Sequence, residues 1–307
     1  MKIIFLDAST LGAASLEPIA SLGDLVCYPY SSPQEALERV KEAEVLIINK
    51  VKVTAELMDA APRLRLICEA ATGVNNIDLE AAAARGIPVK NVAGYSTDSV
   101  VQLTFALILN LLCRTAEYDS YVKGGEYSAS PIFTEVSRPF TELAGKTMGI
   151  IGMGTIGSRV AKAAEAFGMK VIYFSTSGTS HCKEYPSVSI DELMSQSDVV
   201  SIHAPLNART NGLIKARELA LMRPGAIIIN IGRGGIVDEQ ALADAISQER
   251  IAGAGLDVFS REPLPADNPL LHTAHPERLS FTPHIGWASK EALNRLVQGI
   301  ASNIRNL

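Results

Sequence analysis

TMGIIGMGTIGSRVAKAAEAFG, residues 147–168, is the stretch that decides the fold. Its first residues predict a buried strand, and the Ala-rich segment at its end predicts a helix. Gly152, Gly154 and Gly157 lie between the two with the spacing G-x-G-x-x-G. Gly152 permits a tight turn, Gly154 lets a ligand approach the backbone, and Gly157 lets the helix pack close to the strand. The stretch therefore predicts the first half of a dinucleotide-binding βαβ unit.

The start of the helix after this turn presents backbone N–H groups, from Thr155 and Ile156 onward, to a phosphate. A βα turn without a ligand is the plain alternative. Strand, glycines and helix nevertheless occur here in the order that a dinucleotide site requires. We therefore expect a nicotinamide dinucleotide as cofactor.

The choice between NAD and NADP depends on the end of the next strand, at Ser175 in YFSTSG. An acid at that position binds the adenosine ribose and repels a 2′-phosphate, whereas Ser175 offers only a hydroxyl. The nearest bases along the chain are His181 and Lys183. Because phosphate binding needs cations, we expect weak discrimination, with NAD used somewhat better than NADP.

Outside this stretch, β-branched runs alternate with amphipathic, Ala-rich segments over most of the chain. This pattern predicts an α/β protein with two doubly wound parallel-sheet domains. Residues 96–115 predict a long buried helix, and residues 117–143 a polar, aromatic-bearing excursion that serves as a packing arm or an oligomer contact. Helices are expected at 32–43 and 77–85, and strands at 2–7, 45–49, 64–70, 87–91, 147–154, 170–175, 199–204, 226–231, 252–258 and 279–285.

The bulk composition excludes several classes of protein. With 307 residues, a net charge of −5 and 20% charged residues, the chain has no basic surplus for nucleic acid or for an anionic membrane. The apolar runs are too short to span a bilayer, and the N-terminus predicts a strand rather than a signal peptide. The four cysteines form no C-x-x-C pair, which favours a reducing, cytoplasmic location and no structural metal.

Three expected strands are each followed by a group suited to a carboxylate substrate. Arg233, in Gly-Arg-Gly-Gly, can form two parallel hydrogen bonds with a 2-keto acid. His284, in Pro-His-Ile-Gly, can supply the proton that a reduced carbonyl oxygen needs. Glu262 can hold the His284 ring and favour its imidazolium form. A capping histidine, a surface glutamate and an arginine at a helix start are the plain alternatives, but successive strand ends favour a shared site.

Several long motifs resemble the D-isomer-specific 2-hydroxyacid dehydrogenase family, in the family's order and over nearly the whole chain. Within that family, GYSTDSVVQ, the ELAGKT segment and HIGWAS look like the glycerate dehydrogenase (hydroxypyruvate reductase) branch. The motifs are ATGVNNID (71–78), NVAGYSTDSVVQ (91–102), ELAGKTMGIIGMGTIG (142–157), SDVVSIHAPLNARTNGLI (197–214), NIGRGGIVDEQAL (230–242), GLDVFSREP (255–263) and TPHIGWAS (282–289).

The resemblance implies a catalytic set and a substrate loop. Arg233 would orient the substrate, Glu262 would pair with His284, and His284 would act as general acid and base. The backbone of Thr72, Gly73 and Val74 would receive the substrate carboxylate. Asp257 would contact the nicotinamide carboxamide. The remaining cofactor contacts would be His203, which packs beside the cofactor rather than titrating, with Ala204, Pro205, Thr210, Ile231, Gly232, Arg233, His284 and Gly286.

The resemblance also implies a Rossmann cofactor domain, residues 98–287, inserted in a flavodoxin-like substrate domain, residues 1–97 and 288–307. The predicted reaction is hydride transfer between NAD(P)H and a small 2-keto acid, with hydroxypyruvate or glyoxylate as the expected substrate. Two features depart from the family. Ser175 replaces the usual acid, and the usual tail strand does not follow Asn306 and Leu307.

Other functions stay open. A dehydrogenase for pyruvate or a bulkier keto acid is the nearest, and a corepressor-like NAD-sensing module is the alternative from another class. Glu262 argues against a formate dehydrogenase, which has Gln there. We expect a homodimer that uses residues 96–143. Trp287 is expected to close the site or to pack, Lys50 to be exposed, and His181, His272 and His275 to lie on the surface.

Overall fold

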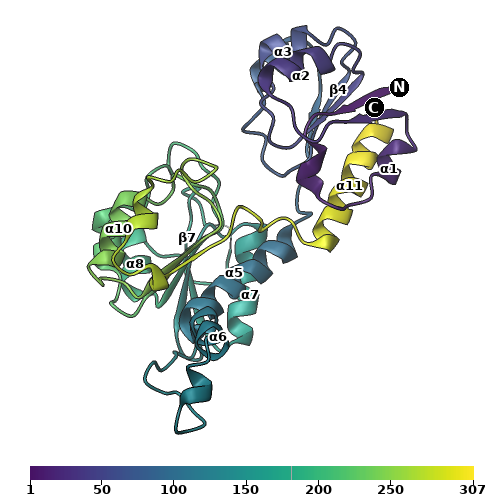
Figure 1. The fold of residues 1–307 in the computed structure, drawn as a ribbon. Coiled ribbons are helices and arrows are strands. Elements are labelled where there is room, and N and C mark those ends of the chain that lie inside the picture. The colour runs from purple at the N-terminus through teal and green to yellow at the C-terminus, as the bar shows by residue number, and fades with distance from the viewer. Residues whose placement is uncertain (181) are drawn as a thin grey trace. The chain divides into compact units, whose positions relative to one another are not determined.

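The computed structural model describes residues 1–180 and 182–307, and His181 lies outside the described residues (Figure 1). The chain divides into two compact units, Met1–Ser96 with Trp287–Leu307, and Thr97–Gly286. The expected boundaries, 97/98 and 287/288, differ from these by one residue. Both units are parallel α/β layers, which confirms the predicted fold class.

The first unit contains a five-stranded parallel sheet in the order β2-β1-β3-β4-β5, the flavodoxin-like order. Strands β3 and β4 are buried along their whole length, as expected for a parallel sheet covered on both faces. Its strands are β1 (Lys2–Phe5), β2 (Asp24–Cys27), β3 (Val45–Ile48), β4 (Leu66–Glu69) and β5 (Val89–Lys90).

Helices cover both faces of this sheet. On one face α11 (Lys290–Arg305) packs against α1 (Glu17–Ala20) and β4, so the C-terminal segment completes the core of the N-terminal unit. A second core lies on the other face, under α2 (Pro33–Arg39), α3 (Ala55–Asp59) and α4 (Leu79–Ala84). A short 3-10 helix, η1 (Ala8–Leu11), follows β1.

The second unit contains a six-stranded parallel sheet in the order β11-β10-β9-β8-β6-β7. An isolated parallel bridge between Tyr173 and Ser187 adds a further position beyond β7. With that bridge, the edge of the sheet has the order of a Rossmann fold. The strands are β6 (Thr147–Ile151), β7 (Lys170–Phe174), β8 (Val199–Ile202), β9 (Ile227–Asn230), β10 (Gly253–Leu256) and β11 (Leu279–Phe281).

Two cores flank this sheet as well. The long helix α5 (Thr97–Cys113) buries Phe105 and Ile108 beside α7 (Thr155–Ala166), which confirms the expected buried helix. The other face is covered by helices that include α9 and α10. The remaining elements are α6 (Thr115–Lys123), η2 (Tyr127–Ala129), α8 (Ile190–Gln196), α9 (Ala216–Leu221), α10 (Glu239–Ser247), η3 (Pro269–His272) and η4 (Pro276–Arg278).

Three expectations about elements were wrong. The sequence did not indicate β2, because this short edge strand is partly exposed and begins with an acid. The excursion at 117–143 contains the helix α6, which has no buried residue to produce an apolar periodicity. Strands β6, β10 and β11 end earlier than expected, because the residues after them leave the sheet and form loops.

A membrane-spanning segment was not expected, and the comparison concerns residues 1–180 and 182–307. No single helix among them is long and apolar enough to cross a bilayer. Only α5 and α6 together, which meet at a 60° bend, reach the necessary length and composition.

Candidate active site

The three expected catalytic residues follow three neighbouring strands. Arg233 lies in the loop after β9, Glu262 in the loop after β10 and His284 in the loop after β11. The strands are parallel and adjacent, so all three loops leave the same edge of the sheet. Ligands of open α/β sheets bind beyond this carboxyl edge.

Glu262 and His284 form a hydrogen-bonded pair. The distance from His284 Nδ1 to Glu262 Oε2 is 2.7 Å, and the two side chains are 26% and 35% exposed. Glu262 Oε1 accepts a hydrogen bond from the Phe259 N–H at 2.9 Å, which fixes the carboxylate. The pair thus orients the imidazole and holds Nδ1 on Glu262, so that Nε2 is the nitrogen suited to exchanging a proton with a ligand.

The backbone of His284 has a left-handed conformation, with φ +56°. Such a conformation is uncommon for a residue with a side chain and is found at sites where the surroundings enforce it. Here the surrounding residue is Asp257, which is 1% exposed. Its carboxylate accepts hydrogen bonds from the N–H groups of Ile285 and Gly286, both at 2.8 Å, and from the Thr282 hydroxyl at 2.6 Å. Asp257 therefore clamps the loop on both sides of His284.

The loop of Arg233 lies directly against the loop after β10. A Cβ atom at Gly234 would lie 1.8 Å from the Phe259 carbonyl oxygen, so only glycine fits. Asn230 Nδ2 donates to the Arg233 carbonyl at 2.9 Å, and Arg233 Nη1 donates to the Gly232 carbonyl at 2.8 Å. Half-buried Arg233 is thus held on a short, well-anchored loop.

The glycine-rich turn has the geometry of a phosphate site. Gly152 has φ +94°, and a Cβ atom at Gly157 would lie 2.2 Å from the Gly152 carbonyl oxygen. Gly154 is the N-cap of α7 with no capping side chain, and no atom lies within 4 Å of where its Cβ would be. Backbone N–H groups at the start of a twelve-residue helix therefore face open space, as a pyrophosphate requires. The residues present fit a dinucleotide.

The next loop, after β8, packs against this turn. A Cβ atom on Gly152 would lie 3.0 Å from the backbone of His203 and Ala204. His203 Nε2 lies 2.8 Å from the Ser201 hydroxyl, and burial lowers the pKa of His203 to about 4, so the ring is neutral. Buried Thr210 donates to the Pro205 carbonyl at 2.6 Å. The Thr210 hydroxyl thus stabilises the conformation of the loop after β8 by a hydrogen bond within that loop.

Two expected cofactor positions beside the catalytic loops are tightly packed. Ile231 is 7% exposed and belongs to the core between α5 and the sheet. A Cβ atom at Gly286 would lie 3.0 Å from both Asp257 Oδ2 and Ile231 Cγ2. Any ligand contact at these positions is therefore made by the backbone or by one face of the Ile231 side chain.

Ser175 follows β7 directly and forms hydrogen bonds within its own turn. Its hydroxyl donates to the Thr179 carbonyl at 2.6 Å and lies 3.1 Å from the Ser177 hydroxyl. Arg209, from the loop after β8, donates to the Ser177 carbonyl at 2.6 Å. Sequence reasoning missed this arginine because it lies 32 positions from Ser177 and matches no local motif.

The expected substrate loop, Thr72 to Val74, lies in the first unit after β4. Asn91 Nδ2 donates to the Thr72 carbonyl at 2.6 Å, and Val74 packs against the core of its unit. In the same unit the Lys50 ammonium lies 5.3 Å from the centre of the Trp287 ring, a cation–π contact. Lys50 is exposed, as expected, and Trp287 is half-buried.

Comparison with known proteins identifies the family. Residues 105–286 match the family model of the D-isomer specific 2-hydroxyacid dehydrogenase NAD binding domain. The hydroxypyruvate reductase of Blautia hydrogenotrophica is 36% identical over 314 residues, which cover 99% of this chain and 96% of the relative. This chain belongs to the D-isomer-specific 2-hydroxyacid dehydrogenase family.

Solved structures agree with this membership. The D-lactate dehydrogenase of Aquifex aeolicus, complexed with NAD and lactic acid, has a TM-score of 0.85 and 31% identity, with 99% of this chain and 94% of that chain covered. An acyclic imino acid reductase, Bsp5, in complex with NADPH and D-Arg, has a TM-score of 0.88 and 32% identity, with 100% and 96% covered. This member of the family is therefore an NAD(P)-dependent 2-hydroxyacid dehydrogenase.

Proposed function

We propose that this dehydrogenase reduces a small 2-keto acid, hydroxypyruvate or glyoxylate, to D-glycerate or glycolate. Residues 1–97 and 288–307 would form the substrate domain, and residues 98–287 the cofactor domain. The similarity to a hydroxypyruvate reductase over nearly the full chain supports the substrate class. The single observation that carries the chemistry is the hydrogen-bonded pair of His284 with Glu262 beside Arg233 at one sheet edge.

Each catalytic residue has a distinct role in this proposal. Bound NAD(P)H supplies the hydride that adds to the keto carbon. Arg233 binds the substrate carboxylate and carbonyl through its planar guanidinium, which positions the carbon for attack. His284 donates the proton from Nε2 to the carbonyl oxygen, while Glu262 stabilises the imidazolium. In the reverse direction His284 accepts the proton of the hydroxyl group.

The remaining site residues hold the ligands. The glycine-rich turn and the N–H groups of Thr155 and Ile156 bind the pyrophosphate, and the loop after β8 lies along the adenosine. Asp257, whose oxygens already anchor the His284 loop, has lone pairs left for the nicotinamide carboxamide. The Thr72–Val74 backbone binds the substrate carboxylate.

The test is a substrate panel with both cofactors. Oxidation of NADH and NADPH is followed by absorbance with hydroxypyruvate, glyoxylate, pyruvate and a branched keto acid. We expect the highest kcat/KM with hydroxypyruvate or glyoxylate. A preference for pyruvate or the branched acid would make this a different D-2-hydroxyacid dehydrogenase. Nucleotide binding without turnover on any substrate would favour the corepressor-like, NAD-sensing function.

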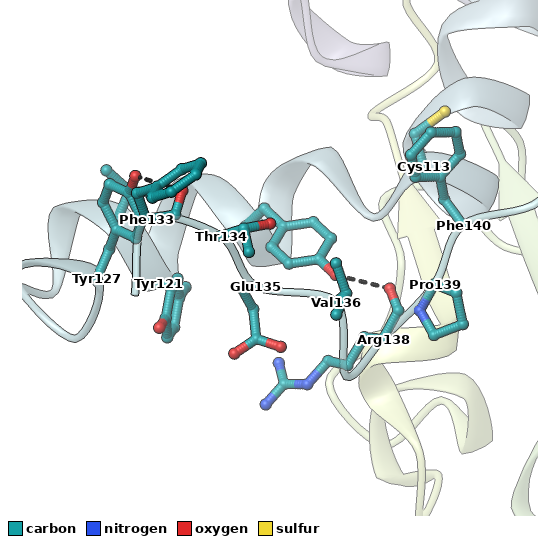
Figure 2. Close-up of a pocket in the computed structure, with 12 residues that line it drawn as sticks. Cys113, Tyr121, Tyr127, Phe133, Thr134, Glu135, Val136, Arg138, Pro139 and Phe140 are labelled. Carbon is teal, nitrogen blue, oxygen red and sulfur yellow. Dashed lines mark hydrogen bonds between the residues drawn. The ribbon is translucent and has the colours of Figure 1, made fainter. Parts of the chain in front are cut away.

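We further propose that the protein is a homodimer. The arm formed by residues 113–140 has a pocket of about 520 Å³ lined mainly by aromatic and aliphatic side chains, with Thr134, Glu135 and Arg138 among them (Figure 2). Phe133 is 90% exposed and Val136 is 73% exposed. Exposed apolar clusters of this kind mark protein contacts, and a second copy of the chain is the proposed occupant. The contact is proposed for residues 96–143, because α5 buries only five of its seventeen residues within its own unit and the arm adds its exposed apolar side chains.

A cytoplasmic location is also proposed. Cys27, Cys68, Cys113 and Cys182 are free thiols, which suits a reducing compartment. Burial raises the pKa of the Cys68 thiol to about 12, so that this thiol is inert. Fractionation of cells that produce the protein would test this location.

A further inference from the structure

The turn that follows β7 is contacted by an arginine from a different loop. Arg209 Nη1 donates to the Ser177 carbonyl at 2.6 Å. A Cβ atom on Gly178, which has φ +80°, would lie 3.2 Å from the same nitrogen. The Arg209 guanidinium therefore contacts the backbone of Ser177 and Gly178. These residues lie two and three positions after Ser175, the position that faces the adenosine ribose in a Rossmann fold.

This contact lies beside the pyrophosphate turn. In the sheet, β6 lies between β7 and β8, and the glycine-rich turn follows β6. The loops after β7 and β8 therefore flank that turn at the same edge of the sheet. Arg209 bridges the two flanking loops, so its charge lies at the ribose end of the nucleotide site and away from the loops of Arg233 and His284.

The surroundings of the Arg209 guanidinium suit an anion. The turn Ser175–Ser180 contains only Ser, Thr and Gly and so has no carboxylate to repel a phosphate. Among the described residues, no carboxylate forms an ion pair with Arg209. Its backbone is fixed, because the Arg209 N–H donates to Asn207 Oδ1 at 2.9 Å. A preorganised arginine of this kind binds phosphate through charge-assisted hydrogen bonds.

We propose that Arg209, together with the hydroxyls of Ser175 and Ser177, binds the adenosine 2′-phosphate and makes this dehydrogenase prefer NADPH. This proposal rests on the proposed nucleotide site, and it specifies which of the two cofactors that site prefers. From the sequence, Ser175 predicts a slight preference for NADH, because the nearest bases along the chain are no closer than His181 and Lys183. Arg209 supplies that cation through the fold.

Stacking on the adenine ring is the competing role for an exposed arginine at this place. The two roles differ in one measurable respect. An adenine contact strengthens binding of every adenine nucleotide equally, whereas a phosphate contact strengthens only nucleotides with a 2′-phosphate. The probes are therefore 5′-AMP and 2′,5′-ADP, which differ by the 2′-phosphate alone.

The experiment is calorimetric titration of the full chain with both probes. Wild type, Arg209→Gln and Arg250→Gln are compared. Arg250 is the control because it is exposed, belongs to the same unit and precedes the amino end of β10, at the other edge of the sheet. We expect wild type and R250Q to bind 2′,5′-ADP about 10- to 100-fold more tightly than 5′-AMP. R209Q should lose most of this ratio while its affinity for 5′-AMP is retained.

Kinetics provide a second readout. The ratio of kcat/KM for NADPH to that for NADH should exceed one in wild type, fall about tenfold or more in R209Q and reverse in Ser175→Asp, which adds a repelling carboxylate. Equal affinity of wild type for the two probes, or equal losses for both in R209Q, would overturn the proposal and leave the proposed reaction intact. Failure of wild type to bind 5′-AMP would instead overturn the nucleotide site itself.

Discussion

At the scale of single residues, the site depends on side chains that fix the backbone beside the reacting groups. Asp257 accepts hydrogen bonds from two consecutive N–H groups just after His284. This clamp sustains the left-handed backbone of His284. Glu262 then fixes the ring itself. The proposed proton donor, His284, is thus preorganised, so that little reorganisation would be needed at the moment of reaction.

His284→Ala should lower kcat by roughly 10²- to 10⁴-fold, because general acid catalysis contributes about that much. The affinity for the reduced cofactor should be little changed, since the pyrophosphate turn is untouched. Steady-state kinetics and a fluorescence titration measure the two effects. His272→Ala, at an exposed position on η3, is the matched control and should retain wild-type kcat. A near wild-type kcat in H284A would remove His284 from the mechanism.

Arg233→Lys retains the charge but not the planar fork that binds a carboxylate with two hydrogen bonds. We expect kcat/KM for the keto acid to fall about 10- to 100-fold, as the loss of a charge-assisted hydrogen bond implies. Cofactor affinity should change little. If R233K instead lost cofactor affinity and kept full turnover at saturation, Arg233 would be a cofactor ligand and not the substrate clamp.

At the scale of elements, the carboxyl ends of β1, β3 and β4 surround a buried polar cluster in the first unit. Asp7 accepts hydrogen bonds from the N–H groups of Asn49, Lys50 and Val51. Glu69 is fully buried, and its Oε2 accepts a hydrogen bond from Asn76 Nδ2 at 3.0 Å. Burial raises the pKa of Glu69 from 4.5 to about 9. A neutral Glu69 therefore lies at the start of the loop that carries Thr72 and Val74.

This raised pKa makes stability depend on pH in a predictable direction. Between about pH 4.5 and 9 the folded chain keeps the Glu69 proton that the unfolded chain has released. The free energy of unfolding therefore falls as pH rises, by at most ~1.4 kcal/mol per pH unit from this group. Glu69→Gln is neutral at every pH and should remove this contribution.

Urea denaturation at pH 5, 6.5 and 8 measures the effect. The stability of E69Q relative to wild type should rise steadily with pH. Glu80→Gln, at an exposed position on α4, controls for the substitution itself. A difference between E69Q and wild type that stays constant from pH 5 to 8 would mean that Glu69 is ionised in the folded protein.

At the scale of the whole molecule, the arm formed by residues 113–140 has no residue that is buried within its own unit. Its exposed apolar side chains include Ile132, Phe133, Val136 and Phe140. Two tyrosine hydroxyls hold it in shape, Tyr118 to the Arg138 carbonyl and Tyr127 to the Phe133 carbonyl (Figure 2). An ordered arm with an apolar surface is expected to be covered in the assembled protein.

Light scattering at micromolar concentration should give twice the chain mass of 32.8 kDa for the wild type. The double substitution F133E/V136E should shift the protein to the mass of a single chain, because two charges per arm would be desolvated in the interface. Tyr30→Glu, an exposed aromatic position in the first unit, is the control and should stay dimeric. A wild type with the mass of one chain would contradict the proposed homodimer.

The sequence by itself determined the two parallel α/β domains and the glycine-rich turn, and it predicted the catalytic roles proposed for Arg233, Glu262 and His284. These features depend on local periodicity and on the residues that follow strand ends. Both signals come from residues that are close together in the sequence. The tertiary structure decided the rest. It brought Arg209 onto the turn of Ser177, set Asp257 against the His284 loop and placed Glu69 where burial keeps it neutral. Each of these depends on contacts between residues distant in the chain, which strand order and packing fix and local patterns do not contain.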